Sequence, residues 1–516
     1  MILQNVKVPV RYTEEELFRA IRKAANNRKL KIHRVEILRR SIDARKKPAL
    51  FYVMTLLVNE KRSLPAVPDI PVNPDDRYVV IGAGPAGLFA ALTLSERGAH
   101  VTVLERGKDV ERRTADVENF FRIGKLDPDS NVQFGEGGAG TFSDGKLNTL
   151  TQDKNGLNAR VLRVFYEAGA PENVLYDARP HVGTDQLPMI VKNIRHRIEQ
   201  AGGTIRFEAH MSDVEIEDGK VRAAVLSDGT RIPADVLILS IGHSARDTLR
   251  MLYEKGLKME QKPFAVGVRM EHPSKDITAW EYGTLDYEEL GAAPYKVTAK
   301  TAGGRGVYSF CMCPGGQVVN SSSEEGYLCI NGMSDSGRSG RNSNSGIVVQ
   351  VFPEDYPSED PLSGVEFQRE MEKKAFEALS GRIPVQLYGD FRDDRVSEHF
   401  GSILPDMKGA YGFSDLRKIL PAAVSDALLE AIPKFGHLIG GFDREDAVMS
   451  AVESRTSSPV RIVRNERGEA EISGLYPCGE GAGYAGGIVS AAMDGIRIAE
   501  LAMENMYERR TDPANQ

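Results

Sequence analysis

The sequence predicts an α/β protein with three parts: a Rossmann-like core domain of alternating strands and helices, an inserted and largely antiparallel β domain, and a small N-terminal βαββ module. Between residues 77 and 106, a strand, a glycine-rich turn, a helix and a second strand follow one another. Residues 264–400 alternate aromatic, β-branched and polar residues with many turn signals. Prolines at positions 65, 68, 71 and 74 favour a stiff spacer. The predicted parts are a module at 1–62, a linker at 63–76, a discontinuous core domain at 77–263 and 440–505, and an inserted domain at 264–439.

Local signals predict the βαββ order of the N-terminal module. Strands are expected over Ile2–Val10, Lys31–Leu38 and Ala49–Val58. Between the first two, Thr13-Glu-Glu-Glu16 is a capping box that opens a helix.

Charge is unevenly distributed along the chain. Residues 1–66 hold sixteen Lys and Arg against six Asp and Glu, a net charge of +10, so the other 450 residues carry −17 of the total of −7. This asymmetry is compatible with nucleic-acid contact or another partner. The interpretation that we favour is docking of the module on the acidic body. This arrangement would place five basic residues at the contact or at the rim of the active site: Arg39, Arg40, Arg45, Lys46 and Lys47.

The composition narrows the class of protein. A chain of 516 residues with 41% hydrophobic and 27% charged residues is ordinary for a globular protein of several domains. Four cysteines cannot form a disulfide framework, and their spacing is not that of a metal site. The chain begins without a signal-peptide pattern and has no apolar run of about 18 residues, so we expect a cytoplasmic protein without a transmembrane segment.

The most informative motif lies in residues 77–106. A buried-strand run over Tyr78–Ile81 leads into the GxGxxG turn Gly82-Ala-Gly-Pro-Ala-Gly87, and a helix and the strand His100–Leu104 follow. In such a turn the first glycine makes a tight bend, the second lets backbone N–H groups reach a pyrophosphate, and the third lets helix and strand pack closely. Glu105, 18 residues after the third glycine, would accept hydrogen bonds from a ribose. The motif predicts a dinucleotide site.

A second glycine cluster precedes the last predicted helix, Val489–Met503. No return strand and no ribose-binding acid follow it, so a second dinucleotide site is excluded. The segment is better suited to a flavin. Glu480 can hold the ribityl or pyrophosphate region, and the helix N-terminus near Gly486–Ile488 can stabilise negative charge on the flavin pyrimidine edge.

Three further segments are predicted from glycine content and pattern. The loop Gly135–Lys146 is too rich in glycine to be only a connector. The buried strand that begins at Val236 leads into a turn at Gly242 and returns the chain to the core domain. The serine-rich segment Ser334–Gly346 is expected to be a flexible loop.

Together these motifs resemble the two-domain FAD oxidoreductases of the glutathione-reductase type. More closely, the chain resembles a widespread bacterial family of uncharacterised FAD-dependent dehydrogenases that has plastid relatives. The resemblance covers residues 1 to about 505 and includes Ser41–Arg45, Phe134–Lys146, His181–Asp185, Ile241–Asp247, Phe310–Gly316, Glu453–Pro459 and Gly479–Gly487. It implies FAD, with the core domain as the FAD-binding domain and the inserted domain as the substrate or cap domain, and it supplies no substrate.

The resemblance also implies individual cofactor contacts. Arg106 would lie beside the adenine, and Met211, at the end of the strand from Ile205, would contact the adenine through its backbone. Residues Gly137–Thr141 would pass close to the flavin ring. The expected cofactor contacts are Gly82, Gly84, Pro85, Ala86, Gly87, Glu105, Arg106, Gly137, Gly138, Ala139, Gly140, Thr141, Met211, Gly242, Gly479, Glu480, Gly486, Gly487 and Ile488.

Few residues are required for catalysis, because the cofactor carries the difficult chemistry. Lys146 or Asp144 could orient substrate or assist proton transfer, or could be a solvent-facing cation and a turn cap. His243 is a candidate acid–base residue, and His181 another, beside the alternative of structural histidines. Arg338 and Arg341 could contact an anionic substrate or a nicotinamide dinucleotide phosphate, or could belong to a solvated loop. Arg455 could contact an anion or be structural. Cys311 and Cys313 do not have the spacing of a CxxC redox pair and are interpreted as buried structural thiols.

The sequence therefore predicts an FAD-dependent oxidoreductase that acts by hydride transfer through flavin N5 on a small-molecule substrate, with an anionic substrate left open. NAD(P)H is a candidate transient reductant, because no second dinucleotide domain is visible. Two alternatives remain. The basic module could direct a flavoprotein to RNA, or the protein could reduce an isoprenoid or quinone at a membrane surface.

Overall fold

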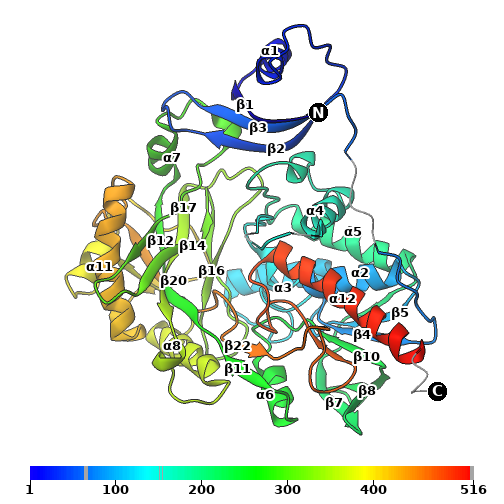
Figure 1. Cartoon of the computed structure of the whole chain (residues 1–516). Coiled ribbons are helices and arrows are strands. Elements are labelled where there is room, and N and C mark those ends of the chain that lie inside the picture. The colour runs from blue at the N-terminus through cyan, green and yellow to red at the C-terminus, as the bar shows by residue number, and fades with distance from the viewer. Residues whose placement is uncertain (63–67, 150, 154, 512–516) are drawn as a thin grey trace.

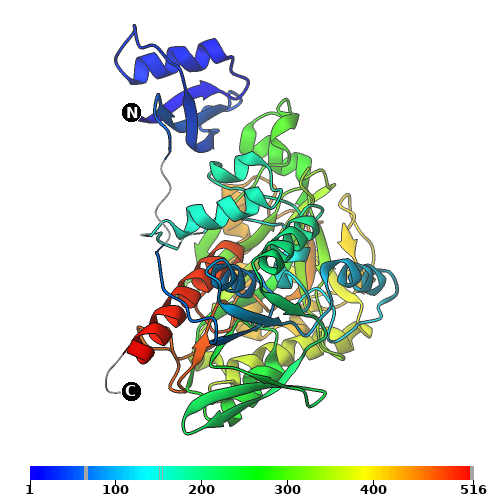
Figure 2. The same ribbon diagram turned by 90° about the vertical axis from the view of Figure 1, so that its right-hand side faces the viewer.

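The computed structural model describes residues 1–62, 68–149, 151–153 and 155–511. The predicted linker at 63–76 therefore lies partly outside the described residues. The N-terminal module forms the top of the molecule in Figure 1, above a body in which the core domain and the inserted domain lie side by side. Figure 2, turned by 90°, also shows the module above the body.

The N-terminal module has the predicted βαββ order: β1 (Ile2–Pro9), α1 (Glu14–Ala24), β2 (Val35–Asp43) and β3 (Phe51–Val58). Its antiparallel sheet has the order β1-β3-β2, and the capping box between Thr13 and Glu16 is formed. The sequence predicted that the second strand begins at Lys31, but in the structure it begins at Val35. The amides of His33 and Arg34 donate instead to the side chain of Asn59, so they are not available to a strand ladder.

The module docks on the body through its edge strand β2 and through Arg11, which donates to Glu289 at 2.6 and 2.8 Å. Arg40 donates two hydrogen bonds to the carboxylate of Asp177, at 2.7 and 3.0 Å. Its backbone pairs with the segment beside Asp177, since the Arg40 amide donates to the Tyr176 carbonyl at 2.7 Å. Among the other predicted docking residues, Lys47 donates to the Trp280 carbonyl, whereas Arg45 pairs with Asp43 of the module itself.

The core domain contains a five-stranded parallel sheet in the order β23-β10-β4-β5-β6. Its strands are β4 (Arg77–Ile81), β5 (His100–Leu104), β6 (Thr204–Arg206), β10 (Val236–Leu239) and β23 (Leu475–Pro477). Helix α2 (Pro85–Ser95) is apolar on all sides, as expected for a buried helix. It packs between the sheet, α5 (Leu187–Gln200) and the C-terminal α12 (Ile488–Thr511).

A three-stranded antiparallel sheet follows β6 in the core domain. It consists of β7 (Met211–Glu217), β8 (Lys220–Leu226) and β9 (Arg231–Pro233). Met211 therefore begins β7, and the prediction that it ends the strand from Ile205 is wrong. The chain turns between the two strands at Glu208, which adopts a positive φ of 54°.

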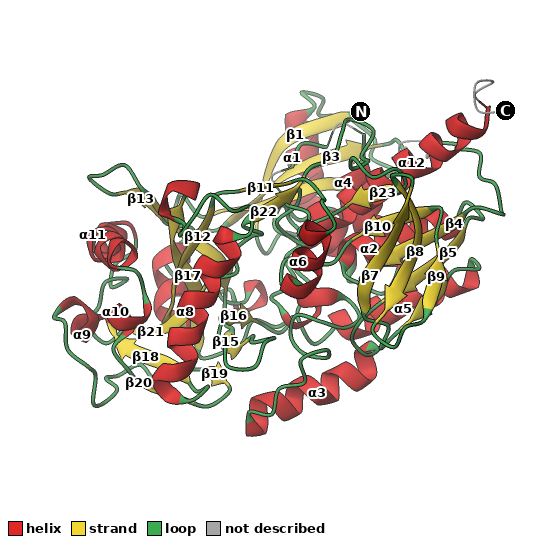
Figure 3. Cartoon of the chain, turned by 90° about the horizontal axis from the view of Figure 1, so that it is seen from below, coloured by secondary structure: helices red, strands yellow, loops and turns green. Residues whose placement is uncertain are grey.

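The inserted domain is built on a seven-stranded sheet in the order β13-β14-β17-β12-β21-β18-β20. The pairs are antiparallel except β18–β20. The strands are β12 (Phe264–Pro273), β13 (Thr298–Lys300), β14 (Gly306–Cys313), β17 (Asn342–Val351), β18 (Ile383–Leu387), β20 (Tyr411–Phe413) and β21 (Val448–Glu453). Helices α8 (Ser363–Leu379) and α11 (Ala422–Leu438) pack against this sheet and close a large apolar core (Figure 3).

Two sequence predictions about this domain need correction. Strand β21 lies between β12 and β18, so its residues belong to this sheet and not to the core domain, which was predicted to resume at 440. The segment Ser334–Gly346 is a loop only in its first part. From Asn342 onward it forms the buried strand β17, because its backbone pairs with β12 on one side and β14 on the other, which the local serine content does not reveal.

The remaining elements connect the two domains or cover their edges. A two-stranded ribbon of β11 (Met259–Gln261) and β22 (Val460–Ile462) joins them. The other elements are β15 (Gln317–Asn320), β16 (Ile330–Met333), β19 (Met407–Lys408), α3 (Val110–Ile123), α4 (Leu157–Glu167), α6 (Arg246–Glu254), α7 (Ser274–Tyr282), α9 (Tyr388–Arg392) and α10 (Leu416–Ile419). Within the described ranges, we find no helix whose length and apolar character would allow it to cross a membrane.

Candidate functional site

A cavity of about 360 Å³ runs between the core domain and the inserted domain. One end is formed by the glycine turn after β4 and by the residues that follow β5. The other end is formed by the loop that contains Lys146 and by residues of the inserted domain that include Cys311, Asn331 and Glu453. Residues that are far apart in the chain thus face one space.

The glycine turn has the geometry that the motif predicts. Gly82 has a φ of +97°, and a Cβ atom there would lie 2.5 Å from the Ser240 carbonyl oxygen. A Cβ on Gly87 would lie 1.9 Å from the carbonyl oxygen of Gly82, so helix α2 can approach the strand only with glycine at this position. Gly84 caps α2 without a side-chain hydrogen bond. The first amides of the helix are therefore available to an anion in the cavity.

Glu105 ties the end of β5 to this turn. Its buried carboxylate accepts hydrogen bonds from the amides of Ala83 at 2.7 Å, Gly107 at 2.9 Å and Gly135 at 2.9 Å. Two of these bonds go to Oε1 and one goes to Oε2. Because each carboxylate oxygen has two lone pairs, Oε2 retains the capacity to accept a further hydrogen bond from a ligand hydroxyl.

Arg106 and Met211 line the neighbouring part of the cavity. The Arg106 guanidinium lies 4.4 Å from the centre of the Phe134 ring and donates to Asp247 at 2.8 Å. These contacts fix the side chain and leave a flat, partly apolar wall of the kind that an adenine ring contacts.

The C-terminal glycine cluster lines the same cavity where α12 begins. Gly486 and Gly487 precede α12, and no atom lies within 4 Å of a Cβ placed on either residue. The same is true of Gly242. Beside them, His243 Nδ1 and Glu480 Oε1 are 2.9 Å apart. These backbones leave space for a bound group, which side chains would fill.

The polar groups and glycines fit an FAD molecule. Uncapped amides of α2 suit a pyrophosphate, the remaining capacity of Glu105 suits a ribose, and the open glycines lie where α12 begins. Of the predicted cofactor contacts, Gly87, Gly137, Thr141 and Gly479 do not line the cavity. Gly87 is a packing glycine, and Gly137 packs against Thr141. The Gly479 amide donates to Asp494 at 2.8 Å.

At the far end of the cavity, the predicted residues Asp144 and Lys146 form an ion pair of 2.9 Å. Arg338 Nη2 lies 3.7 Å and His181 Nε2 3.8 Å from the same carboxylate. Burial raises the pKa of Asp144, but the Lys146 charge and its neighbours outweigh burial, so the net shift is downward. Burial lowers the pKa of His181 to about 4, which leaves this imidazole neutral at pH 7.

Glu453, a residue that sequence reasoning did not single out, lines the same end of the cavity. Arg269 Nε donates to its carboxylate at 2.6 Å, and both side chains are buried. Burial raises the pKa of Glu453 to about 7 in spite of this partner. The carboxyl can therefore gain or lose a proton near neutral pH.

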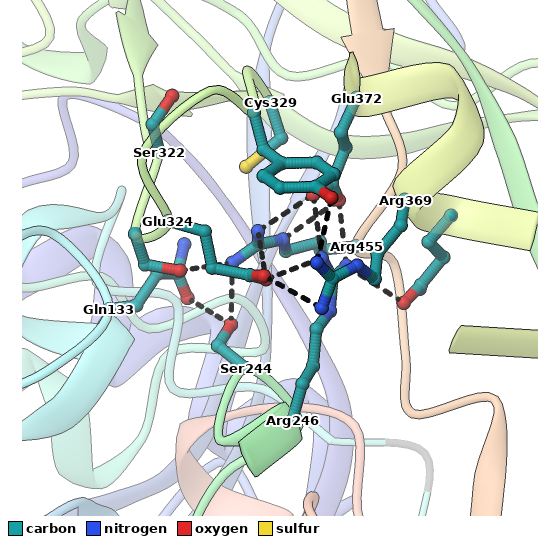
Figure 4. Close-up of polar contacts among 12 residues, drawn as sticks. Gln133, Ser244, Arg246, Ser322, Glu324, Cys329, Arg369, Glu372 and Arg455 are labelled. Atoms are coloured by element: carbon teal, nitrogen blue, oxygen red, sulfur yellow. Dashed lines mark hydrogen bonds and ion pairs between the residues drawn. The ribbon is translucent and has the colours of Figure 1, made fainter. Parts of the chain in front are cut away.

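A buried ion network joins the two domains beside the cavity (Figure 4). Arg246 of α6 and Arg455 both donate two hydrogen bonds to the carboxylate of Glu372 in α8, at 2.8–3.0 Å. Although burial opposes it, these two charges lower the pKa of Glu372. Arg455, which the sequence left open as an anion contact, also donates to Ser244 at 3.0 Å. Its donors are thus engaged within the protein.

Comparisons with known proteins agree with this site. A family model described as FAD dependent oxidoreductase matches residues 77–117, and one described as FAD-dependent protein, C-terminal domain-like, matches residues 263–456. A domain of unknown function matches residues 1–59.

Three proteins with decreasing sequence identity to this chain are similar to it. An uncharacterised protein of Clostridium beijerinckii is 44% identical over 526 residues, which cover 97% of this chain and 98% of that one. The tRNA uridine 5-carboxymethylaminomethyl modification enzyme MnmG of Finegoldia magna is 22% identical over 259 residues, 50% of this chain and 38% of that enzyme. The solved structure of glycine oxidase from Bacillus cereus is 12% identical, with a TM-score of 0.35, and the match covers 84% of this chain and 96% of that one. The chain belongs to the family of the Clostridium protein, a family of FAD-dependent oxidoreductases.

Proposed function

We propose that this FAD-dependent oxidoreductase exchanges a hydride with a small-molecule substrate bound at the Lys146 end of the cavity. One observation carries the proposal: a single cavity connects the dinucleotide turn at Gly84 with the ionisable side chains of Lys146 and Glu453. A redox cofactor and its substrate need this combination of a nucleotide cradle at one end and groups that hold charge or protons at the other.

The core domain would hold the nucleotide. The first amides of α2 would bind the pyrophosphate, Glu105 would accept a hydrogen bond from the ribose, and Arg106 and Met211 would line the adenine site. Gly486 and Gly487 would let the backbone at the start of α12 approach the flavin. FAD, when bound, supplies hydride transfer through flavin N5.

The groups at the far end would serve the substrate. The neighbouring Asp144 carboxylate raises the pKa of Lys146 in spite of burial, so its ammonium stays charged at neutral pH and can orient an anionic or carbonyl substrate. Asp144 would act as a positioning residue, because its carboxylate holds the Lys146 ammonium in a 2.9 Å ion pair. Glu453 is suited to take up or release the proton that accompanies hydride exchange. His243 would position Glu480 through their hydrogen bond.

Anaerobic mixing of the purified protein with NADH or NADPH tests the proposal. We expect bleaching of the oxidised flavin spectrum by one of these donors, followed by reoxidation with members of an oxidant panel. If neither a nicotinamide donor nor any panel compound changes the flavin spectrum, the proposed reaction is wrong.

A further inference from the structure

Cys311 faces the cavity although the sequence suggested a structural thiol. It lines the far end of the cavity and is partly exposed to it, whereas Cys313, Cys329 and Cys478 are buried at 0–1% exposure. Among the residues that the structure describes, it is the cysteine that a molecule in this cavity could touch.

The backbone is distorted at Cys311. Strand β14 loses its register with β17 between Phe310 and Cys313, which marks a bulge. Cys311 has a φ of +41°, a conformation that residues with a Cβ rarely adopt. The guanidinium of Arg269 donates to its carbonyl at 3.2 Å and so holds the distorted turn. Bulges and strained residues of this kind are common beside active sites, where they redirect a side chain.

The surroundings of the Cys311 sulfur favour an anion. Its Sγ lies 4.0 Å from Lys146 Nζ. The carboxylate of Asp144 forms ion pairs with both Lys146 and Arg338. Two permanent cations thus share one carboxylate, and His181 is neutral at pH 7. Arg269, the third cation near the sulfur, has its own partner in the carboxylate of Glu453 at 2.6 Å, so a thiolate at Cys311 would balance the one positive charge that Asp144 leaves.

The pKa shifts agree with this geometry. The Cys313 thiol nearby, together with the charges of Lys146 and Arg269, lowers the pKa of Cys311 well below its usual value in spite of burial. Burial raises the pKa of the other three thiols. Activated thiols are typically found next to Lys or Arg in partly exposed positions.

We propose that Cys311 is held as a thiolate by Lys146 and adds to small electrophiles of the conjugated carbonyl class at the substrate end of the cavity. This inference rests on the proposed function for the location of the substrate. In the addition, the sulfur electron pair forms a C–S bond with the β-carbon. The π electrons of the C=C bond shift toward the carbonyl, and water gives a proton to the α-carbon, leaving hydroxide as the other product. No electrons are gained or lost.

The competing explanation of the positive charge is a site for a substrate anion, with Cys311 as an ordinary neutral thiol. The two explanations differ in the protonation state of the sulfur. A thiolate reacts rapidly at neutral pH, whereas a neutral thiol reacts only as the pH approaches about 8.5.

Acrylamide is a suitable probe, because it is a small conjugated amide that alkylates thiolates. The FAD-loaded protein is treated with acrylamide across a pH series, and the modified peptides are quantified by mass spectrometry. We expect modification of Cys311 before the other three cysteines, with a rate midpoint at least one pH unit below that of an ordinary thiol. Lys146→Met should slow modification at pH 7 about tenfold, and Lys146→Arg should restore it. Lys374→Met, on the exposed face of α8, is the matched control.

Two outcomes overturn the proposal: Cys311 reacts no faster than the buried cysteines, or its pH midpoint is the same in the wild type and in Lys146→Met. If bound flavin covers the sulfur, the pH-dependent ultraviolet absorption of the thiolate, measured as wild type minus Cys311→Ser, decides the same question. Loss of this difference at neutral pH also overturns it. Flavin reduction is measured separately. If the flavin is reduced but Cys311 is inert, only this inference is refuted. If Cys311 is reactive but the flavin is never reduced, only the proposed function is refuted.

Discussion

Glu105 Oε2 accepts a 2.7 Å hydrogen bond from the amide of Ala83, and this contact fixes the end of β5 against the glycine turn. The same carboxylate holds Gly107 and Gly135, so one side chain connects three segments that surround the nucleotide end of the cavity. A residue expected from the sequence to bind the ribose thus also organises the protein part of the site.

Glu105→Gln should weaken FAD binding about 10- to 100-fold, because loss of the charge removes strong hydrogen bonds to buried amides and to the ribose, a cost of about 1.5–3 kcal/mol. Fluorescence titration of the flavin-stripped protein with FAD measures the effect. Glu118→Gln, at an exposed position of α3, is the control. Equal affinity in Glu105→Gln and wild type would show that the carboxylate does not serve the cofactor.

Two glycine substitutions should have opposite consequences. Gly487→Ala places a methyl group in open space, so the melting temperature should be close to that of the wild type while FAD affinity falls at least about tenfold. Gly87→Ala places a methyl group 1.9 Å from the Gly82 carbonyl oxygen and should cost at least about 2 kcal/mol of stability. Thermal unfolding and FAD titration of both variants distinguish them. A Gly487→Ala protein with unchanged FAD affinity would contradict the proposed approach of the cofactor.

Stability should depend on pH through Glu271 of β12. Burial raises the pKa of this carboxyl to about 8, whereas in the unfolded chain it ionises near its usual value of about 4.3. The stability that the protonated form contributes is therefore complete below about pH 4 and is lost as the pH rises to about 8. Glu271→Gln cannot ionise, so over this range its stability should rise relative to wild type by roughly 3–5 kcal/mol.

Urea unfolding of wild type and Glu271→Gln at pH 5 and pH 8 checks this prediction. Glu377→Gln, on the exposed surface of α8, serves as the control for loss of one carboxylate. Parallel stability curves for wild type and Glu271→Gln would mean that Glu271 is ionised in the folded protein.

Docking of the N-terminal module should depend on Arg40 and Asp177. Their paired, half-buried contact should give a coupling free energy of about 1 kcal/mol in a double-mutant cycle of Arg40→Ala and Asp177→Ala. Hydrogen exchange at the amides of Arg40 and Ala178 should become faster in either single variant. The exposed pair Arg19–Glu15 of α1 is the control, with a coupling near zero. Unchanged exchange in Arg40→Ala would show that the module is held by other contacts.

The parts of the fold that local signals specify could be predicted from the sequence. The capping box at Thr13, the turn at Gly82 and the acid at Glu105 each act on residues close in the chain or on a standard motif. Membership of β21 in the seven-stranded sheet could not be predicted, because it depends on pairing with β12 nearly two hundred residues earlier. In the same way, nothing local to Lys146 indicates that it meets Cys311 across 165 positions.

The residues of the candidate site also divide into those that a local pattern indicates and those whose role depends on distant contacts. Glycines with a backbone role were recognisable, although Gly137 and Gly479 proved to pack inside the protein. Cys311 was predicted to be buried but is partly exposed, because a regular strand would turn Cys311 and Cys313 to the same side, and a bulge separates them. Glu453 begins the segment Glu453–Pro459, but nothing in that segment indicates its pKa of about 7, which results from burial among residues of other strands.

The most direct test of the central claim compares amide hydrogen exchange in the FAD-loaded and flavin-stripped protein. If the cofactor spans the cavity, FAD should protect the turn at Gly82–Leu88, and also the loop at Gly138–Lys146 and the start of α12 at Gly486–Ser490. Protection limited to the turn and the end of β5 would contradict the account, because the redox end of the cofactor would then lie away from Lys146 and Glu453.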